Sequence, residues 1–117
     1  MFTGKWRNAN RSEMSLTQSG SQIIGVYRTR VGDDRVLMED HALVGATVGE
    51  LIGFVVAWQG TNSLTSWAGR LVQLDKNTQQ IHTVWHLVRE SDDGIPPRRL
   101  EPWECFQTYS AVFTRIR

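Results

Sequence analysis

The chain has 117 residues, a length that suits one domain over residues 1–117. Its formal net charge is +1, so it lacks the strong positive electrostatic field that nucleic-acid or membrane-surface binding uses. Charged residues make up 21% and hydrophobic residues 40% of the chain, which excludes a disordered protein. No apolar run approaches the roughly 18 residues of a transmembrane helix. A single cysteine, Cys105, excludes an intramolecular disulfide and CxxC-type zinc or redox motifs.

Short segments of alternating polar and apolar residues recur along the chain and are separated by turn residues. In chain order they predict eight strands, over residues 4–8, 13–17, 23–31, 42–47, 50–59, 64–74, 80–89 and 104–115. The segments are rich in Val, Ile, Thr and aromatic residues, which suit a pleated surface, and none has apolar residues at helical spacing. The pattern therefore predicts an all-β fold, either an up-and-down barrel or a sandwich.

Alternation along each strand places the bulky aromatic residues on one face, together with small hydroxyls and an amide. This face carries Trp6, Asn8, Gly25, Tyr27, Thr29, Val31, Phe54, Val56, Trp58, Ser63, Thr65, Trp67, Gly69, Thr83, Trp85 and Leu87. Aromatic walls with a few neutral hydrogen-bonding groups are typical of a ligand site. A well-packed core with satisfied hydroxyls gives the same pattern, and the residues alone leave both interpretations open.

The aromatic face is expected to lack acids, bases and histidines, which argues against catalysis, because acid–base and nucleophilic mechanisms need a titratable group at the site. His82 and His86 lie about 13 Å apart at strand rise, too far to share a metal, and face away from Trp85. His41 is assigned to a polar surface loop. We therefore expect no enzyme activity, no catalytic residues, no metal and no cofactor.

Several segments follow one another in a specific order and spacing. They are Thr3–Asn8 with Ser12, Gly25–Gly32, Gly53–Trp58, Ser63–Gly69, Thr83–Leu87, and Trp103 with Phe113–Arg115. Together they resemble the avidin family over nearly the whole chain. The resemblance implies a closed eight-stranded antiparallel up-and-down β-barrel with one ligand pocket at its open end. It also implies high-affinity, non-catalytic binding of biotin.

Biotin is a fused cyclic urea and thioether ring with a valerate tail. The resemblance implies that Asn8, Ser12 and Tyr27 donate to the ureido oxygen, that Thr29 accepts from one ureido N–H, and that Thr65 faces the ring sulfur. Around the apolar body of biotin it implies contacts with Trp58, Trp67, Trp85, Leu87 and Val31. At the carboxylate it implies Ser63 and the backbone near Asp33. It also implies that Trp103 is donated by a neighbouring subunit. The polar groups are neutral, so such a pocket can be dry without burying a charge.

The resemblance at Trp103 implies a self-associating protein, expected to be a homotetramer whose subunits complete one another's sites. The alternative is a loop tryptophan packed on its own barrel. Small or polar residues at Val84, Thr108 and Ser110, where the family forms a weaker contact between barrels, leave room for another assembly. By the same resemblance the protein is expected to be secreted or periplasmic, although no signal peptide is visible at its beginning.

One departure from the family bears on affinity. Ala111 stands where the family has Asp or Asn, which accepts the second ureido N–H. A buried donor left unpaired costs about 1–3 kcal/mol, or about one to two decades of affinity, so weakened binding is expected. A water, Ser110 or Tyr109 could substitute, the two side chains after a local shift to point inward.

Two other functions remain as alternatives. A lipocalin-like carrier of another small apolar ligand would leave the Asn8, Ser12, Tyr27 and Thr29 set unexplained. A barrel that acts as an inhibitor or structural protein without binding biotin is favoured only by Ala111.

Overall fold

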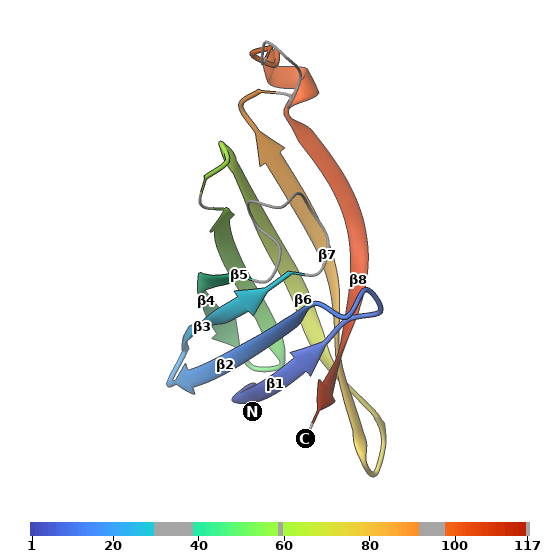
Figure 1. The fold of residues 1–117 in the computed structure, drawn as a ribbon. Coiled ribbons are helices and arrows are strands. Elements are labelled where there is room, and N and C mark those ends of the chain that lie inside the picture. Colours follow the sequence, from blue (N-terminus) through green and yellow to red (C-terminus); the bar gives the residue numbers. More distant parts are fainter. Residues whose placement is uncertain (30–38, 59, 92–97, 117) are drawn as a thin grey trace.

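The strands form one closed barrel. The structure is a computed structural model that describes residues 1–29, 39–58, 60–91 and 98–116. The strands are β1 (Gly4–Arg7), β2 (Glu13–Ser19), β3 (Gln22–Arg28), β4 (Asp40–Val48), β5 (Leu51–Trp58), β6 (Ser63–Asp75), β7 (Thr78–Arg89) and β8 (Phe106–Ile116). Each pairs antiparallel with its neighbours in sequence, and β1 pairs with β8 to close the sheet (Figure 1). The eight-stranded up-and-down barrel is confirmed and the sandwich is excluded.

All eight predicted strands are present, but several of their ends differ from the observed ones by two or three residues. The third predicted strand ran to residue 31, whereas β3 ends at Arg28, and Val31 lies outside the described residues. The last strand was predicted from Glu104, but Pro102–Glu104 forms a short 3₁₀ helix, η1, and β8 begins at Phe106. Proline at the first turn and a capping box between Glu101 and Glu104 account for this turn of helix.

The barrel interior follows the predicted alternation. Its buried apolar side chains come from every strand and are Trp6, Met14, Leu16, Ile23, Tyr27, Leu43, Ile52, Phe54, Val56, Trp67, Ile81 and Phe113. Phe2, which precedes β1, joins them and accepts a 2.9 Å hydrogen bond on its carbonyl from the Trp6 indole. The Arg115 guanidinium lies 4.3 Å from the centroid of the Trp6 ring and donates to the carbonyl of Thr3. These contacts hold the first and last strands together at the end of the barrel where both termini lie.

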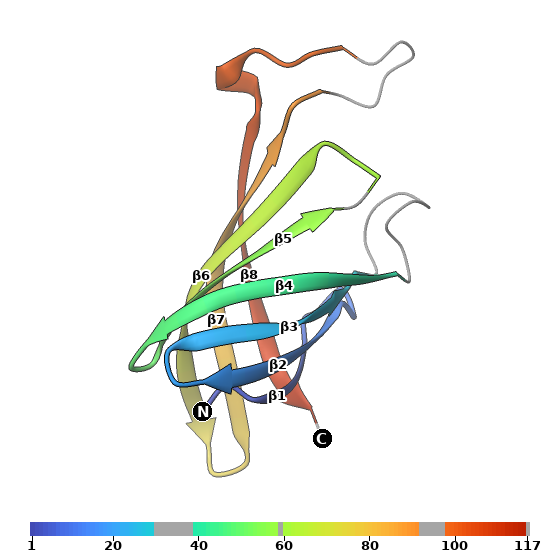
Figure 2. The ribbon, with the colours of Figure 1, turned by 90° about the vertical axis from the view of Figure 1, so that its left-hand side faces the viewer.

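The two ends of the barrel differ. At the end near the termini, the β6–β7 hairpin extends past the other strands (Figure 1). At the opposite end, β7 and β8 project beyond the barrel and carry η1 at their tip (Figure 2). A bridge between Ser91 and Arg99 continues the pairing into this projection. Across the described ranges, no helix is long and apolar enough to cross a membrane.

Gly45 allows β4 and β5 to approach closely, and this closeness can be tested. A Cβ at Gly45 would lie 2.1 Å from the carbonyl oxygen of Gly53 and 2.8 Å from Cβ of Phe54. We expect Gly45→Ala to lower the free energy of unfolding by about 1–3 kcal/mol in urea denaturation, because the strands must move apart. Gly53→Ala is the matched control, since its Cβ would meet nothing closer than 3.7 Å. Equal unfolding midpoints for the two variants would contradict this account of the strand contact.

Candidate functional site

Three polar side chains meet where β1, β2 and β3 come together. The Tyr27 hydroxyl on β3 is hydrogen-bonded to the side chains of Ser12 and Asn8. Asn8 follows β1, and its Oδ1 accepts hydrogen bonds from the backbone N–H groups of Asn10 and Ser12, both at 3.0 Å. Because Oδ1 accepts these two hydrogen bonds within the turn, it is the Nδ2 amino group of Asn8 that can donate hydrogen bonds to the cluster or to a ligand. Arg11 adopts a φ of 66°, a strained conformation for a side-chain-bearing residue, and this turn delivers Ser12 to the cluster.

The cluster is uncharged; two of its three side chains are fully buried and Asn8 is half-buried. Ser12 is 2% exposed and Tyr27 is 4% exposed. Burial raises the pKa of Tyr27 from 10.0 to about 12, against the opposing effect of its hydrogen bonds to Ser12 and Asn8. The phenol is therefore neutral at physiological pH. The cluster offers hydroxyl and amide donors that can converge on one ligand oxygen without burying a charge.

Aromatic rings continue from this cluster along the inner wall. The Tyr27 ring centroid lies 5.1 Å from that of Trp67 and 5.7 Å from that of Trp58, and Phe54 stacks on Trp67 at 4.9 Å. The Trp58 indole donates a 2.7 Å hydrogen bond to Oγ1 of Thr65, which fixes the orientation of its ring. Side chains from β3, β5 and β6 thus form one continuous aromatic wall beside the polar cluster.

His41 was wrongly predicted to lie in a surface loop. It lies on the inner face of β4, is 2% exposed, and its ring centroid is 5.0 Å from that of Trp58 in an edge-on arrangement. It is also the cross-strand partner of Tyr27. The prediction failed because β4 begins at Asp40, two residues earlier than expected, which gives His41 the inward parity of Leu43. The inner face therefore does carry a histidine.

The other predicted contact residues are distributed along the same wall. Thr29 is 6% exposed and follows β3. Ser63 is half-buried at the start of β6, with its Oγ 2.6 Å from Oγ1 of Thr61. Trp85 and Leu87 are half-buried on the inner face of β7. Val31 and Asp33 lie outside the described residues.

Trp103 is separate from this wall. It lies in η1 at the tip of the β7–β8 projection and is 80% exposed (Figure 2). The alternative that it packs on its own barrel is therefore wrong. Two hydrogen bonds from the Arg98 guanidinium to the Glu104 carboxylate, at 3.1 and 2.6 Å, help to hold η1 in shape.

Tyr109 was wrongly expected to need a shift to point inward. It has the parity of Ala111 and Phe113 on β8 and its ring centroid lies 4.6 Å from that of Trp85, while the side chain is 50% exposed where β8 projects from the barrel. Counting back by two from the buried Phe113 would have placed it correctly. Ser110 is exposed on the outer face, as expected.

The outer histidines lie as predicted. His82 and His86 are exposed and bond to Gln80 and Thr108, respectively. Across the part of the chain that the structure describes, no group of three or more His, Cys, Asp or Glu residues could hold a metal ion.

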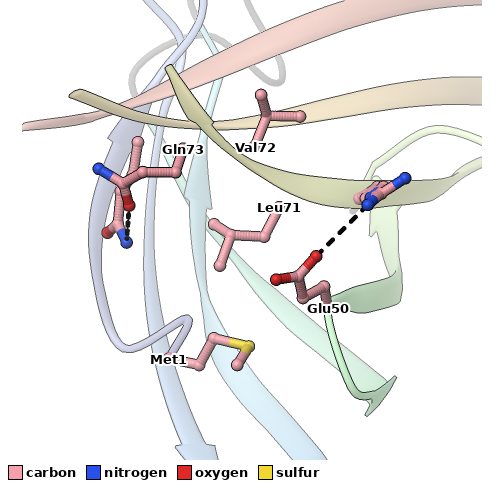
Figure 3. A pocket seen from close by; sticks show the side chains of 7 residues that line it. Met1, Glu50, Leu71, Val72 and Gln73 are labelled. Atoms are coloured by element: carbon pink, nitrogen blue, oxygen red, sulfur yellow. Dashed lines mark hydrogen bonds and ion pairs between the residues drawn. The ribbon is translucent and has the colours of Figure 1, made fainter. Parts of the chain in front are cut away.

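A separate hollow lies at the end of the barrel near the termini. It is lined by Met1, Glu50, Arg70, Leu71, Val72, Gln73 and Gln79 (Figure 3). None of these residues is fully buried, and the Glu50–Arg70 ion pair is long, at 3.6 Å, and exposed. Such a pair is screened by water and contributes little. The hollow thus lacks the buried, converging polar groups found around Tyr27.

The raised pKa of Tyr27 predicts a distinct alkaline transition. The folded protein holds the Tyr27 proton more tightly than the unfolded chain does. The folded state is therefore favoured fully below pH 10, and this part of its stability is lost as the pH rises toward 12. We expect a phenolate absorbance component that titrates near pH 12 and disappears in Tyr27→Phe. Over that range the wild type should lose on the order of 3 kcal/mol more stability than the variant. Titration of Tyr27 at the ordinary value of 10.0 would contradict the buried geometry.

Known proteins share both the sequence pattern and the barrel. The model of the avidin family matches residues 1–115. Afifavidin of Afifella pfennigii is 32% identical over 97 residues, which cover 79% of this chain and 60% of afifavidin. This chain therefore matches less than two thirds of the length of that relative. Avidin of Gallus gallus is 27% identical over 124 aligned positions, which cover 99% of this chain and 78% of avidin.

Solved structures agree with these matches. A rhizavidin–biotin complex superposes with a TM-score of 0.80 at 24% identity, covering 98% of this chain and 92% of rhizavidin, which shows the shared fold. The complex of short afifavidin with biotin superposes with a TM-score of 0.77 at 28% identity, covering 97% of this chain and 87% of that one. With the family matched along nearly its whole length and the same closed barrel, this chain belongs to the avidin family.

Proposed function

We propose that this protein binds biotin without catalysing any reaction on it, inside the barrel at the end away from the chain termini. The observation that carries the proposal is the convergence of Asn8, Ser12 and Tyr27 beside the aromatic wall. The structure of short afifavidin in complex with biotin, from a relative 28% identical in sequence, supports the same ligand class.

The polar cluster suits the ureido oxygen. A polarised urea oxygen can accept several hydrogen bonds at once, and the hydroxyls of Ser12 and Tyr27 with the Asn8 amide are the groups that would donate them. Each donor is neutral, so the ligand can be bound in a dry site without the desolvation cost of a buried ion. Thr29, buried two residues after Tyr27, is proposed to accept one ureido N–H.

The aromatic wall suits the apolar body of biotin. Each tryptophan ring can bury about 150–250 Å² of surface, which makes Trp58, Trp67 and Trp85 the main source of affinity, with Leu87 filling the space beside them. Oγ1 of Thr65 accepts a hydrogen bond from Trp58, so its own proton is available to point at the ring sulfur.

The valerate end of biotin is proposed to lie toward the β7–β8 projection. Ser63 stands at the start of β6, half-buried, and suits the carboxylate. Val31 and Asp33 are assigned to the site by family resemblance alone. The same resemblance is the whole basis for expecting a secreted or periplasmic protein.

Trp103 is proposed to close the site of a neighbouring subunit in a homotetramer. A tryptophan that is 80% exposed at the tip of a projection is an apolar surface that another protein surface would cover favourably. The Arg98–Glu104 pair and the capping box hold the short helix that presents it.

Ala111 is proposed to make this binding weaker than a side-chain acceptor would. It is half-buried on the inner face of β8, and its methyl group cannot accept a hydrogen bond from a ureido N–H. The expected loss, if nothing replaced that acceptor, is about one to two decades of affinity.

Isothermal titration calorimetry with D-biotin tests the proposal directly. We expect close to one biotin per chain and a dissociation constant below about one micromolar. Ser12→Ala removes a donor from the ureido oxygen and should weaken binding at least about tenfold. Ser15→Ala is the matched control, because Ser15 is exposed on the outer face of β2. The absence of both binding heat and a thermal shift at excess biotin would refute the proposed function.

The role of Trp103 is tested by measuring mass and dissociation rate together. Light scattering should give a multiple of the 13.3 kDa chain mass. Trp103→Ala should release biotin at least about tenfold faster, because the lid indole is lost. Val48→Ala, which shortens an exposed side chain at the opposite end of the barrel, should leave release unchanged. A monomer whose release rate is the same in all three proteins would contradict the lid.

A further inference from the structure

Thr83 lies on the inner face of β7 and has no role in the site as described so far. It is 5% exposed, comparable to Tyr27 and Trp67. In the β7–β8 register it stands directly opposite Ala111, and the next inward pair toward the projection is Trp85 with Tyr109. Thr83 therefore belongs to the wall that carries Trp85, one residue pair deeper in the barrel.

The orientation of the Thr83 side chain is fixed on both sides. Its Oγ1 donates a 2.8 Å hydrogen bond to the backbone carbonyl of Ala111. Its Cγ2 methyl occupies the space left by Gly69, where an added Cβ would come within 2.7 Å of that methyl. A β-branched side chain has few χ1 rotamers, and these two contacts select one of them. The hydroxyl is thus held on the β8 side, beside the methyl group of Ala111.

This orientation decides which hydrogen bonds the hydroxyl can make. A threonine hydroxyl has one proton to donate and two lone pairs. The Ala111 carbonyl takes the proton of Thr83, and within the described ranges no donor is bonded to its lone pairs. Thr65 has the opposite arrangement, because its Oγ1 already accepts from the Trp58 indole. Of these two buried threonines, Thr65 is set to donate and Thr83 is set to accept.

A cyclic urea needs acceptors as well as donors. Its oxygen faces the cluster around Tyr27, and its two N–H groups point to either side of that oxygen. Thr29 stands on one side, next to β3. On the other side, the Phe113 ring lies 6.3 Å from the Tyr27 ring, and Ala111 is the next inward residue of β8. The Thr83–Ala111 pair therefore borders the place where the second N–H would lie.

We propose that Oγ1 of Thr83 accepts the second ureido N–H of biotin and so replaces the acceptor that Ala111 lacks. This inference rests on the proposed function and concerns the same site. It implies that the ligand N–H stays paired, so that Ala111 costs less affinity than an unpaired donor would.

The test is a titration of Thr83→Val with D-biotin, since valine keeps the shape and removes the hydroxyl. We expect the dissociation constant to rise about tenfold, the effect of one lost hydrogen bond to a buried donor. Thr47→Val is the matched control. Thr47 is buried to a similar extent on the inner face of β4, but it lies near the C-terminal end of that strand, away from His41 and Tyr27 at its beginning. It should change biotin affinity by less than about threefold. If Thr83→Val is too unstable to titrate, Thr83→Ser should keep the wild-type affinity and Thr83→Ala should lose it.

A second background separates a ligand contact from a structural role. Ala111→Asn supplies a side-chain acceptor at the same place, so in that background Thr83→Val should cost less than about threefold. An equal, tenfold cost in both backgrounds would overturn the proposal, because it would show that Thr83 acts only by supporting the wall. Unchanged affinity in Thr83→Val would also overturn it while leaving the proposed function intact. If the wild type itself fails to bind biotin, the proposed function fails first and this inference fails with it.

Discussion

Closure of the sheet is the constraint on which the rest of this molecule depends. Pairing of β1 with β8 removes both sheet edges, and an eight-stranded barrel has an interior just wide enough for side chains or one small ligand. The first and last strands are held by Arg115, which lies over the Trp6 ring and bonds to the carbonyl of Thr3. Without this closure, Asn8, which follows β1, and Phe113 on β8 would lie at opposite edges of an open sheet.

Within the closed barrel, hydrogen bonds to neighbouring backbone and side-chain groups orient the polar groups of the site before any ligand arrives. The turn after β1 occupies Oδ1 of Asn8, the Trp58 indole occupies a lone pair of Thr65, and the Ala111 carbonyl takes the proton of Thr83. Each contact removes one of two possible roles from an amide or hydroxyl. Because these side chains are already oriented to donate or to accept, less conformational entropy is lost in ordering them when a ligand binds, which is the general advantage of preorganisation.

His41 gives the inner wall a titratable group that the sequence pattern did not predict. Its ring lies against Trp58 and across from Tyr27, whose phenol keeps its proton well above physiological pH. The start of β4 decided this, because a shift of two residues in a boundary moves one residue from a loop into the barrel. Strand boundaries are weakly encoded in local sequence, where Asp40 and Glu39 resemble turn residues.

The sequence by itself determined the number of strands, their order and the face on which most inner residues lie. Side-chain parity along a strand is a local property, so Trp58, Trp67, Trp85 and Thr83 could be grouped without any knowledge of their partners. Tyr109 could have been grouped in the same way by counting from Phe113.

Only the tertiary structure decided which of those residues meet. The contact of Tyr27 with Asn8 and Ser12, the commitment of the Thr83 hydroxyl to Ala111 and the exposure of Trp103 all depend on the register between strands and on the projection of β7 and β8. Closure arises from contacts between residues distant in the chain, and register depends on turn geometry as well as on alternation, so the pattern within one strand does not show which residues meet across the barrel.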